Sequence, residues 1–262
     1  MKENYKIKQL EIDDVKDFVR IIRESFQSHH LVPSIYRGKG VEQFIINEMD
    51  NIFSPYKYFV AYHNNQVVGS AEFKVFDGSN TFFLNMIASE KEFKGKGIGK
   101  SILNFAVDFF VRLGYENFQL DVYQDNNVAL NWYLTLGFKQ MEYKSLYKVN
   151  TKSYKLEEQR IYIQNYPQYK INKDSYGFNY IDVVSHNESM RIGVIGDDLI
   201  FRGEYRDTTK IIAKILHDSL YFKNIYFIGK DNMTNRSELI FMNNIIRMEL
   251  KLKDDYKDSS QN

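Results

Sequence analysis

Three glycines alternate with lysines in one short run of the chain, immediately ahead of apolar residues that recur at helical spacing. The run reads Phe93-Lys94-Gly95-Lys96-Gly97-Ile98-Gly99-Lys100-Ser101. Because glycine has no Cβ, the backbone can turn so that successive N–H groups converge on an anion. The helix expected after this run adds its free N-terminal amides and the positive end of its dipole. The sequence therefore predicts a phosphate-binding loop that leads into a helix.

The spacing of these glycines separates three kinds of phosphate-binding loop. A P-loop has the pattern GxxxxGK(S/T), but Lys94 stands where its first glycine belongs. A dinucleotide-binding loop has the pattern GxGxxG, but no glycine stands three residues after Gly97. The acyl-CoA pattern (R/Q)xxGx(G/A) fits Lys94 to Gly99, with lysine in place of the usual arginine or glutamine. The sequence favours an acyl-CoA loop, and a P-loop nucleotide hydrolase is the remote alternative.

A second motif follows further along the chain. Five residues have the spacing NxxAxxxYxxxGF: Asn126, Ala129, Tyr133, Gly137 and Phe138. With both motifs in this order, the chain resembles the GNAT family of N-acetyltransferases over roughly residues 1–150. The resemblance implies acetyl-CoA as the cosubstrate and no metal.

The predicted fold class is α/β (α+β), with a GNAT-like mixed central sheet flanked by helices and a second, smaller α+β domain after it. The first domain is expected over residues 1–150, and its apolar patterns predict three kinds of element. The helices are Ile12–Phe26, Val41–Ile52, Gly99–Leu113 and Asn127–Leu136. The strands are Tyr58–Tyr62, Val67–Phe76, Thr81–Ala88, Phe118–Tyr123 and Phe138–Val149. The polar stretch Asn150–Glu158 is typical of a linker.

The second domain is expected over residues 159–252, followed by a disordered tail over residues 253–262. Its predicted strands are Ile181–Val184, Met190–Ile195, Leu199–Arg202, Ile225–Ile228 and Ile246–Leu252, and its predicted helices are Asp207–Phe222 and Ser237–Asn243. This order matches the core of the first half, so a degenerate GNAT-like repeat is one interpretation. The other is an unrelated α+β domain that covers or dimerises the first. The loop Phe201–Arg206 has one glycine and the anionic Glu204, so this half should bind no acetyl-CoA.

Composition narrows the class of protein. The chain has 262 residues, a formal net charge of +1 and no cysteine. Without cysteine, acyl-transfer routes that pass through an acyl-cysteine are excluded. The near-neutral charge favours no nucleic-acid partner. No apolar run approaches the ~18 residues of a membrane span, so we expect a cytoplasmic protein without a membrane partner.

The resemblance also implies how acetyl-CoA would be held. Its pyrophosphate would meet the backbone amides and ammonium groups of Lys94, Gly95, Lys96, Gly97, Ile98, Gly99 and Lys100. The pantetheine arm would lie along the fourth strand, where the backbone of Ile87, Ala88 and Ser89 would face the thioester. Asn126 would reach the pantetheine amides, and an asparagine there equally suits the cap of a helix that begins near Asn127.

Catalytic roles follow from the same resemblance. Tyr133 would act as the general acid that donates a proton to the departing CoA thiolate as an amine attacks the thioester. The attacking ammonium group must lose a proton first, and Glu72 on the third strand is the tentative base. Asp121 on the fifth strand is the other acid considered. His29 and His30 lie in the loop between the first two helices, where members of the family often contact the acceptor. A histidine pair in a loop is, however, usually an exposed surface feature without a catalytic role.

The predicted function is direct transfer of an acetyl group from acetyl-CoA to a primary amine of an unidentified acceptor, either a small molecule or a peptide. The alternative is a non-catalytic CoA-binding sensor or scaffold protein. The sequence is compatible with a homodimer.

Overall fold

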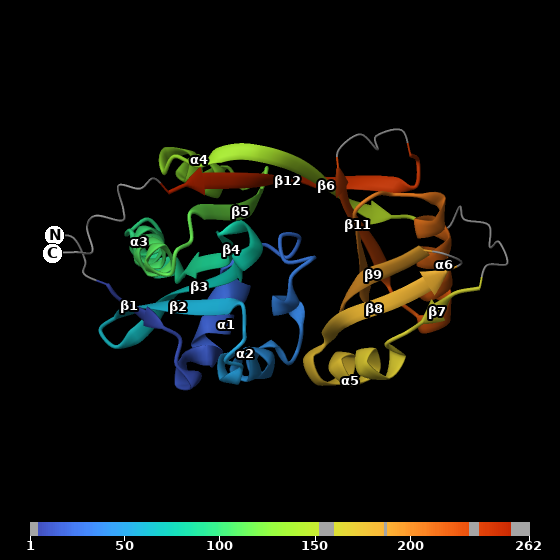
Figure 1. Ribbon diagram of the computed structural model, residues 1–262, viewed down its shortest axis with the longest axis horizontal. Helices are drawn as coiled ribbons and strands as arrows, with labels where there is room; N and C mark the ends of the chain where they lie inside the picture. The colour runs from blue at the N-terminus through green and yellow to red at the C-terminus, as the bar shows by residue number, and fades with distance from the viewer. Residues whose placement is uncertain (1–4, 152–159, 186–187, 231–235, 253–262) are drawn as a thin grey trace.

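A computed structural model describes residues 5–151, 160–185, 188–230 and 236–252, and the strands among these residues form one 12-stranded sheet. Figure 1 shows the two halves of the chain on opposite sides of the molecule. Strands β6 (Lys139–Val149) and β12 (Leu239–Lys251) run between them (Figure 1). Within the described ranges, no helix is long and apolar enough to cross a membrane.

The first half contains the elements that the sequence predicts, together with a short strand at its beginning. Its helices are α1 (Val15–Ser25), α2 (Val41–Asp50), α3 (Ile98–Arg112) and α4 (Asn127–Thr135). Its strands before β6 are β1 (Lys6–Gln9), β2 (Tyr56–His63), β3 (Gln66–Phe76), β4 (Thr81–Ser89) and β5 (Asn117–Tyr123). The predicted helix Ile12–Phe26 begins three residues late, because Ile12–Asp14 forms a 3₁₀ turn.

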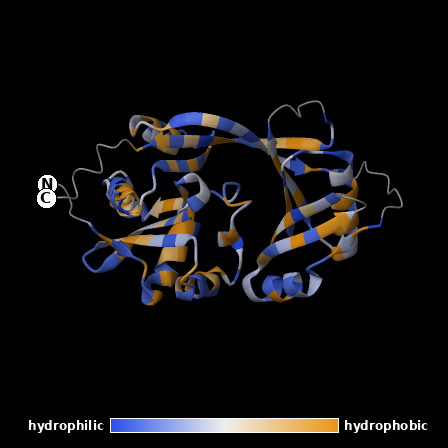
Figure 2. Ribbon diagram, viewed as in Figure 1, coloured by the Kyte–Doolittle hydropathy of each residue, from blue (hydrophilic) through white to orange (hydrophobic). Residues whose placement is uncertain are grey.

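Two apolar clusters hold the helices of this half against the sheet. Neighbouring residues of β2 point to opposite faces, so Val60 packs in the cluster that contains Phe18 and Ile22 of α1. Phe59 packs in the cluster that contains Ile102 and Phe110 of α3. In Figure 2 hydrophobic residues gather on α1, on α3 and on the strands between them. The sheet therefore has α1 on one face and α3 on the other.

The second half departs from the predicted order at both ends: a short strand and a helix precede the predicted strands, and a strand replaces the last predicted helix. Its elements are β7 (Tyr162–Ile163), α5 (Tyr166–Tyr176), β8 (Phe178–Ser185), β9 (Glu188–Ile195), β10 (Asp198–Arg202), α6 (Asp207–Leu220) and β11 (Asn224–Lys230), followed by β12. The predicted helix Ser237–Asn243 is wrong, because the chain from Leu239 onward is the beginning of β12. Leu239 pairs with Val149 and Phe241 with Tyr147, so pairing with a neighbouring strand decides this segment. The predicted tail and most of the predicted linker lie outside the described residues.

The two halves exchange their last strands. The sheet order is β1-β2-β3-β4-β5-β12-β6-β11-β10-β9-β8-β7. Thus β12, from the second half, lies between β5 and β6, while β6, from the first half, lies between β12 and β11. The predicted division near residue 150 separates the sequence but does not separate the sheet, and the domain boundaries stay a prediction.

A second contact joins the halves away from the exchanged strands. The Gly40 N–H donates to the Tyr176 carbonyl over 3.0 Å, and a Cβ at Gly40 would lie 2.3 Å from the Ser175 carbonyl oxygen. Arg37 Nη2 lies 2.6 Å from Asp198 Oδ2, whose side chain is only 4% exposed. These contacts pack the second half on the first.

Candidate functional site

Strands β4 and β5 are parallel neighbours only at their beginnings. Thr81–Leu84 pairs with Asn117–Leu120, and in this fully described region the pairing ends there, although both strands continue. On the β4 side, the pairing ends because of Asn85. Leu84 pairs with Phe73 of β3 and Met86 pairs with Glu72, so Asn85 is a β-bulge that bends β4 away from β5.

We call the unpaired edges of residues 85–89 and 121–123 the β4–β5 fork. Backbone N–H and C=O groups along such an edge can pair with an extended ligand as with an added strand. The predicted contacts Ile87, Ala88 and Ser89 lie on this edge of β4. The fork is therefore a backbone surface of the kind that the pantetheine arm requires.

The glycine loop lies between the end of β4 and α3. Gly95 has φ +77° and Gly97 has φ +90°, and a Cβ at either position would meet no atom within 4 Å. Gly97 is the N-cap of α3, and its carbonyl accepts the Ser101 N–H at 3.0 Å. The amides of Ile98, Gly99 and Lys100 in the first turn of α3 have no partner within the helix. Left-handed glycines and free helical amides beside open space are the geometry that an anion site requires, and we refer to this region as the anion site.

Three residues of the predicted cradle have local roles as well. The N–H groups of Lys94 and Lys96 already donate to the carbonyls of Lys91 and Phe93, at 3.3 and 3.2 Å. Gly99 is needed for packing, because a Cβ there would lie 2.9 Å from Trp132 of α4. The amides best placed for an anion are therefore those around Gly97, and the full cradle stays a prediction.

The charges around the loop favour an anion. Lys94 and Lys100 are exposed, and neither takes part in an ion pair within the ranges that the structure describes. Glu90, which precedes the loop, is neutralised by Arg20 of α1, with Nη2 and Oε1 2.5 Å apart. Positive charge at a helix N-terminus opposes the helix dipole unless an anion is present. The positive charge of Lys94 and Lys100 therefore has no ion-pair partner among the described residues until an anion binds.

Helix α4 carries the second predicted group of residues. Asn126 Oδ1 accepts the Ala129 N–H at 3.2 Å, so Asn126 caps the helix and its amide nitrogen is left to meet a ligand. Tyr133 is buried, with its ring centroid 5.1 Å from that of Trp132 and 5.6 Å from that of Phe138. In the described part of the chain its hydroxyl makes no hydrogen bond. Burial raises the pKa of Tyr133, so its phenol stays protonated at neutral pH.

Glu72 is fully buried rather than open to solvent. Tyr36 donates to Oε2 and Asn85 donates to Oε1 at 2.7 Å, so both oxygens are occupied. Burial raises the pKa of the Glu72 carboxyl, against the opposing effect of these two hydrogen bonds. Because Asn85 is the bulge residue of β4, Glu72 holds the bend that opens the fork. Its predicted role as general base stays a prediction.

Asp121 is paired with Arg247 of β12, whose Nη2 lies 3.0 Å from Oδ2. The guanidinium group also lies 4.9 Å from the centroid of the Phe83 ring. Asp121 therefore fastens the exchanged strand to β5, and its charge is already neutralised. This contact could not be read from the sequence, because the partner comes from the other end of the chain.

The structure brings His29 and His30 to Asp125, which the sequence analysis did not single out. His29 Nε2 lies 3.0 Å from Oδ2 of Asp125, and His30 Nε2 lies 2.8 Å from Oδ1. Burial alone would raise the pKa of Asp125, but the Asn243 amide, His30 and His29 around it hold that pKa at about 2. Asp125 is next to the motif residue Asn126, but nothing in the sequence around it marks it as a partner of the histidines. That role is visible only from its position in the folded chain.

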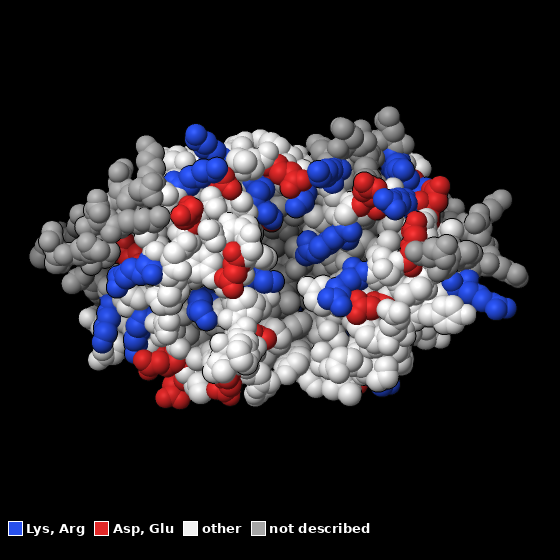
Figure 3. Space-filling model, viewed as in Figure 1, with Lys and Arg blue, Asp and Glu red and all other residues white. Residues whose placement is uncertain are grey.

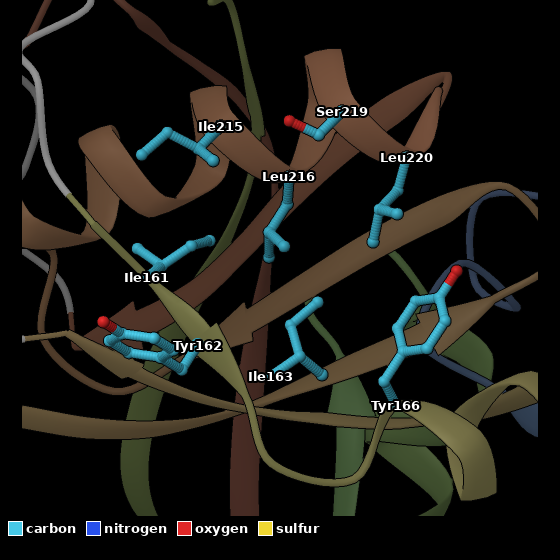
Figure 4. A pocket seen from close by; sticks show the side chains of 8 residues that line it. All are labelled: Ile161, Tyr162, Ile163, Tyr166, Ile215, Leu216, Ser219 and Leu220. Carbon is cyan, nitrogen blue, oxygen red and sulfur yellow. The ribbon is translucent and has the colours of Figure 1, made fainter.

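The described strands of the second half form no such fork. All five residues of β10 pair with β11, from Asp198 with Asn224 to Arg202 with Ile228. At the beginning of α6, Arg206 pairs with Glu204 at 2.6 Å. A groove elsewhere in this half lies between β7 and α6, and its described lining is mostly apolar (Figure 4). The lining residues are Ile161, Tyr162, Ile163, Tyr166, Ile215, Leu216, Ser219 and Leu220.

Comparisons with known proteins agree with this geometry. A family model for the GNAT acetyltransferases matches residues 17–138. N-alpha-acetyltransferase 30 of Schizosaccharomyces pombe is 28% identical over 124 residues, which cover 42% of this chain and 81% of that protein. Spermidine N(1)-acetyltransferase of Thermoplasma acidophilum is 25% identical over 142 residues, covering 51% of this chain and 87% of that protein.

Solved structures extend the likeness of fold to the second half. A tandem GNAT protein from the clavulanic acid biosynthesis pathway superposes with a TM-score of 0.69 at 8% identity, covering 95% of this chain and 98% of that one. A protein of Pyrococcus horikoshii superposes with a TM-score of 0.62 at 15% identity, covering 97% and 91%. Residues 17–138 belong to the GNAT family of N-acetyltransferases, and the chain as a whole has the fold of a tandem GNAT protein.

Proposed function

We propose that the first half transfers an acetyl group from acetyl-CoA directly to a primary amine. The observation that carries this proposal is the β4–β5 fork, since the glycine loop follows its β4 arm along the chain and the helix that carries Tyr133 follows its β5 arm. An acyl-CoA has a pyrophosphate, a peptide-like pantetheine arm and a thioester in this order. The three parts of the site match that order.

Binding would use backbone groups more than side chains. The pyrophosphate would accept hydrogen bonds from the backbone N–H groups around Gly97 and at the start of α3. Lys94 and Lys100 would add positive charge beside it. The pantetheine amides would pair with the free edge of β4 and with the Asn126 side chain. The thioester would then lie near residues 87–89, where a backbone N–H can stabilise the oxyanion of the tetrahedral intermediate.

The transfer step needs one proton removed and one supplied. The neutral amine attacks the thioester carbonyl, the C–N bond forms, and the C–S bond then breaks. Tyr133 donates its phenolic proton to the departing thiolate, for which its raised pKa keeps it protonated. Glu72 remains the tentative base for the ammonium proton, and both Glu72 and the Tyr36 hydroxyl that bonds its carboxylate are buried.

The acceptor is a primary amine of either small-molecule or peptide origin. The relatives' names include N-alpha-acetyltransferases and a spermidine N(1)-acetyltransferase, so a peptide N-terminus and a polyamine are the two classes to compare. Figure 3 shows a hollow between the two halves, bordered by both basic and acidic side chains. An acceptor that enters there would contact both halves.

One observation favours the alternative of a CoA-binding protein without transferase activity. Glu72 is only 3% exposed, both of its oxygens are engaged, and its partner Tyr36 is only 1% exposed, so within the described structure Glu72 has no open route to an acceptor. A protein that has lost transfer could keep this buried network for structure alone.

The two functions are separated by measuring CoA release. The full chain is incubated with acetyl-CoA and either spermidine or a peptide with a free N-terminus, and the free thiol and the acetylated product are followed together. We expect thiol release that depends on the amine and matches product formation. Tight acetyl-CoA binding without amine-dependent release, for both classes of acceptor, would contradict the transferase and support the sensor.

A further inference from the structure

Three metal-ligating side chains converge on the α1 face of the sheet, outside the acetyl-CoA site. His29 and His30 follow α1, and Asp125 lies in the loop between β5 and α4. One ring nitrogen of each histidine and a carboxylate oxygen of Asp125 all lie within 4.8 Å of one another. No contact proposed for acetyl-CoA uses these three side chains.

The arrangement is held before any ligand arrives. The His30 ring stacks on the Tyr123 ring, with centroids 4.7 Å apart and planes 18° apart, and the His30 side chain is only 8% exposed. The His29 and His30 ring centroids are 4.1 Å apart. The turn that carries both is closed by the His30 N–H, which donates to the Gln27 carbonyl at 3.0 Å. Little side-chain entropy remains to be lost on binding.

A buried donor faces this cluster without a partner. Asn243 of β12 is 94% buried, and its Oδ1 accepts the Asn244 N–H at 2.8 Å. That contact fixes the amide so that Nδ2 is the free atom, and Nδ2 has no hydrogen-bond partner in the described structure. It lies near enough to Asp125 to lower the pKa of that carboxyl, but it makes no hydrogen bond of normal geometry with it. Carboxylates that bind metals are commonly oriented by an outer donor of this kind.

We propose that His29, His30 and Asp125 bind a divalent transition-metal ion, with Zn²⁺ as the best fit. Two imidazoles and one carboxylate are the protein ligands of an open tetrahedral zinc site. Mg²⁺ and Ca²⁺ fit less well because they prefer oxygen ligands. Zinc–ligand distances of about 2.0–2.2 Å place neighbouring ligand atoms about 3.3 Å apart, so the 2.8 and 3.0 Å contacts need to open only slightly.

The fourth coordination position would open to solvent. The side chains of His29 and Asp125 are 37% and 48% exposed, while His30 and Tyr123 close the inner side. A metal ion binds an unprotonated ring nitrogen, so Zn²⁺ and protons compete for the two histidines. The site is new relative to the sequence, from which no metal was expected, and it does not depend on the proposed acetyl transfer.

The test is a calorimetric titration of the chelator-treated full chain with ZnCl₂ at neutral pH. We expect one Zn²⁺ per chain, an affinity that falls at least about 100-fold in His30→Gln and Asp125→Asn, and about 10-fold in Asn243→Ala. His217→Gln is the matched control, because His217 Nδ1 lies 2.8 Å from Asp218 Oδ1 in a simple surface pair. That variant should bind Zn²⁺ like the unchanged chain.

Acetyl-CoA affinity provides the folding check for each variant, since it should be unchanged. X-ray absorption of the zinc-loaded chain should report two nitrogen ligands and at least one oxygen ligand at about 2.0–2.2 Å. Equal Zn²⁺ affinity in the unchanged chain and in a correctly folded His30→Gln variant would overturn the proposal. So would loss of binding in His217→Gln, and the cluster would then be an ion pair only.

Discussion

In the first half β4 leaves β5 after Leu84, whereas in the second half β10 stays paired with β11 along its whole length. The first pair opens because Asn85 is an extra residue and because β4 runs on to Ser89. The second pair has no such bulge, and β10 ends at Arg202. One bulge and a few more residues of strand therefore separate the half with an open strand edge from the half in which the described strands stay paired.

The loops that follow these strands differ in the same sense. The first loop has two left-handed glycines beside open space and a cluster of lysines. The second has Gly203 at φ +110°, but the Gly203 N–H already donates to the Ile228 carbonyl, and Glu204 adds negative charge. The two halves share a fold, yet among the described residues the features that favour an anion occur in the first loop, and fold alone does not decide function.

The largest expected effect comes from placing a carboxylate in each loop. Gly97→Asp should abolish acetyl-CoA binding, because it puts a charged side chain into the open space of the anion site and strains a residue at φ +90°. Gly203→Asp is the matched change, with open space and a positive φ in the second half, and should leave affinity unchanged. Calorimetry on both folded variants checks this, and equal loss in both would remove the distinction between the halves.

Tyr133→Phe is expected to lower turnover by about 10²–10⁴ while acetyl-CoA affinity stays the same, because only the proton donor is removed. Tyr147→Phe is the control, since Tyr147 is also buried and its hydroxyl has no partner in the described structure. Steady-state rates and acetyl-CoA binding are measured for both variants. A Tyr133→Phe enzyme as fast as the unchanged one would assign Tyr133 to packing alone.

Glu72→Gln should change how stability depends on pH. Because burial raises the folded pKa of Glu72, its favourable contribution is full below its ordinary value of 4.5 and is lost as pH rises through the raised pKa. The glutamine of the variant does not ionise, so its contribution to stability does not fall as pH rises. Its free energy of unfolding relative to the unchanged chain should therefore increase above pH 4.5, by at most about 1.4 kcal/mol per pH unit.

Urea unfolding at several pH values measures this difference. A difference that does not vary with pH would mean that Glu72 is charged in the folded state as easily as in the unfolded chain. The same variant should show weaker acetyl-CoA binding if Glu72 holds the bulge at Asn85, and a rate loss without a binding loss if Glu72 is mainly the base.

The smallest effect concerns two matched ion pairs between neighbouring strands. Arg247 pairs with Asp121 across β12 and β5, and Arg191 pairs with Asp182 across β9 and β8. The Arg247 side chain is 28% exposed and the Arg191 side chain 67%. After screening by solvent, Arg247→Ala should cost about 1 kcal/mol of stability, and Arg191→Ala should cause no measurable change. Equal effects of both changes on urea unfolding would show that the exchanged strand gains nothing from its ion pair.

Much of the first half could be predicted from the sequence because its signals are local. The alternation of apolar residues in β2 and β3, the glycine loop and the Asn126 cap all act within a few neighbouring residues. Helix α5 was missed although Pro167 near its start and Gly177 at its end, with φ +80°, are typical boundary residues. That signal was present in the sequence.

Other features depend on partners far along the chain. Residues 239–243 carry no helix because β6 lies beside them, and the strand exchange leaves no local mark in the sequence. Asp125 and His30 are separated by 95 positions, so their contact appears only after folding. Burial of Glu72 follows from Tyr36 and Asn85 closing over it, and neither residue marks it in advance.

The number of acetyl-CoA molecules bound per chain tests the central claim most directly. Calorimetric titration of the full chain should give one saturable site, and Gly97→Asp should remove it. Two sites per chain, or one site that survives Gly97→Asp in a folded protein, would contradict the assignment of cofactor binding to the first half alone.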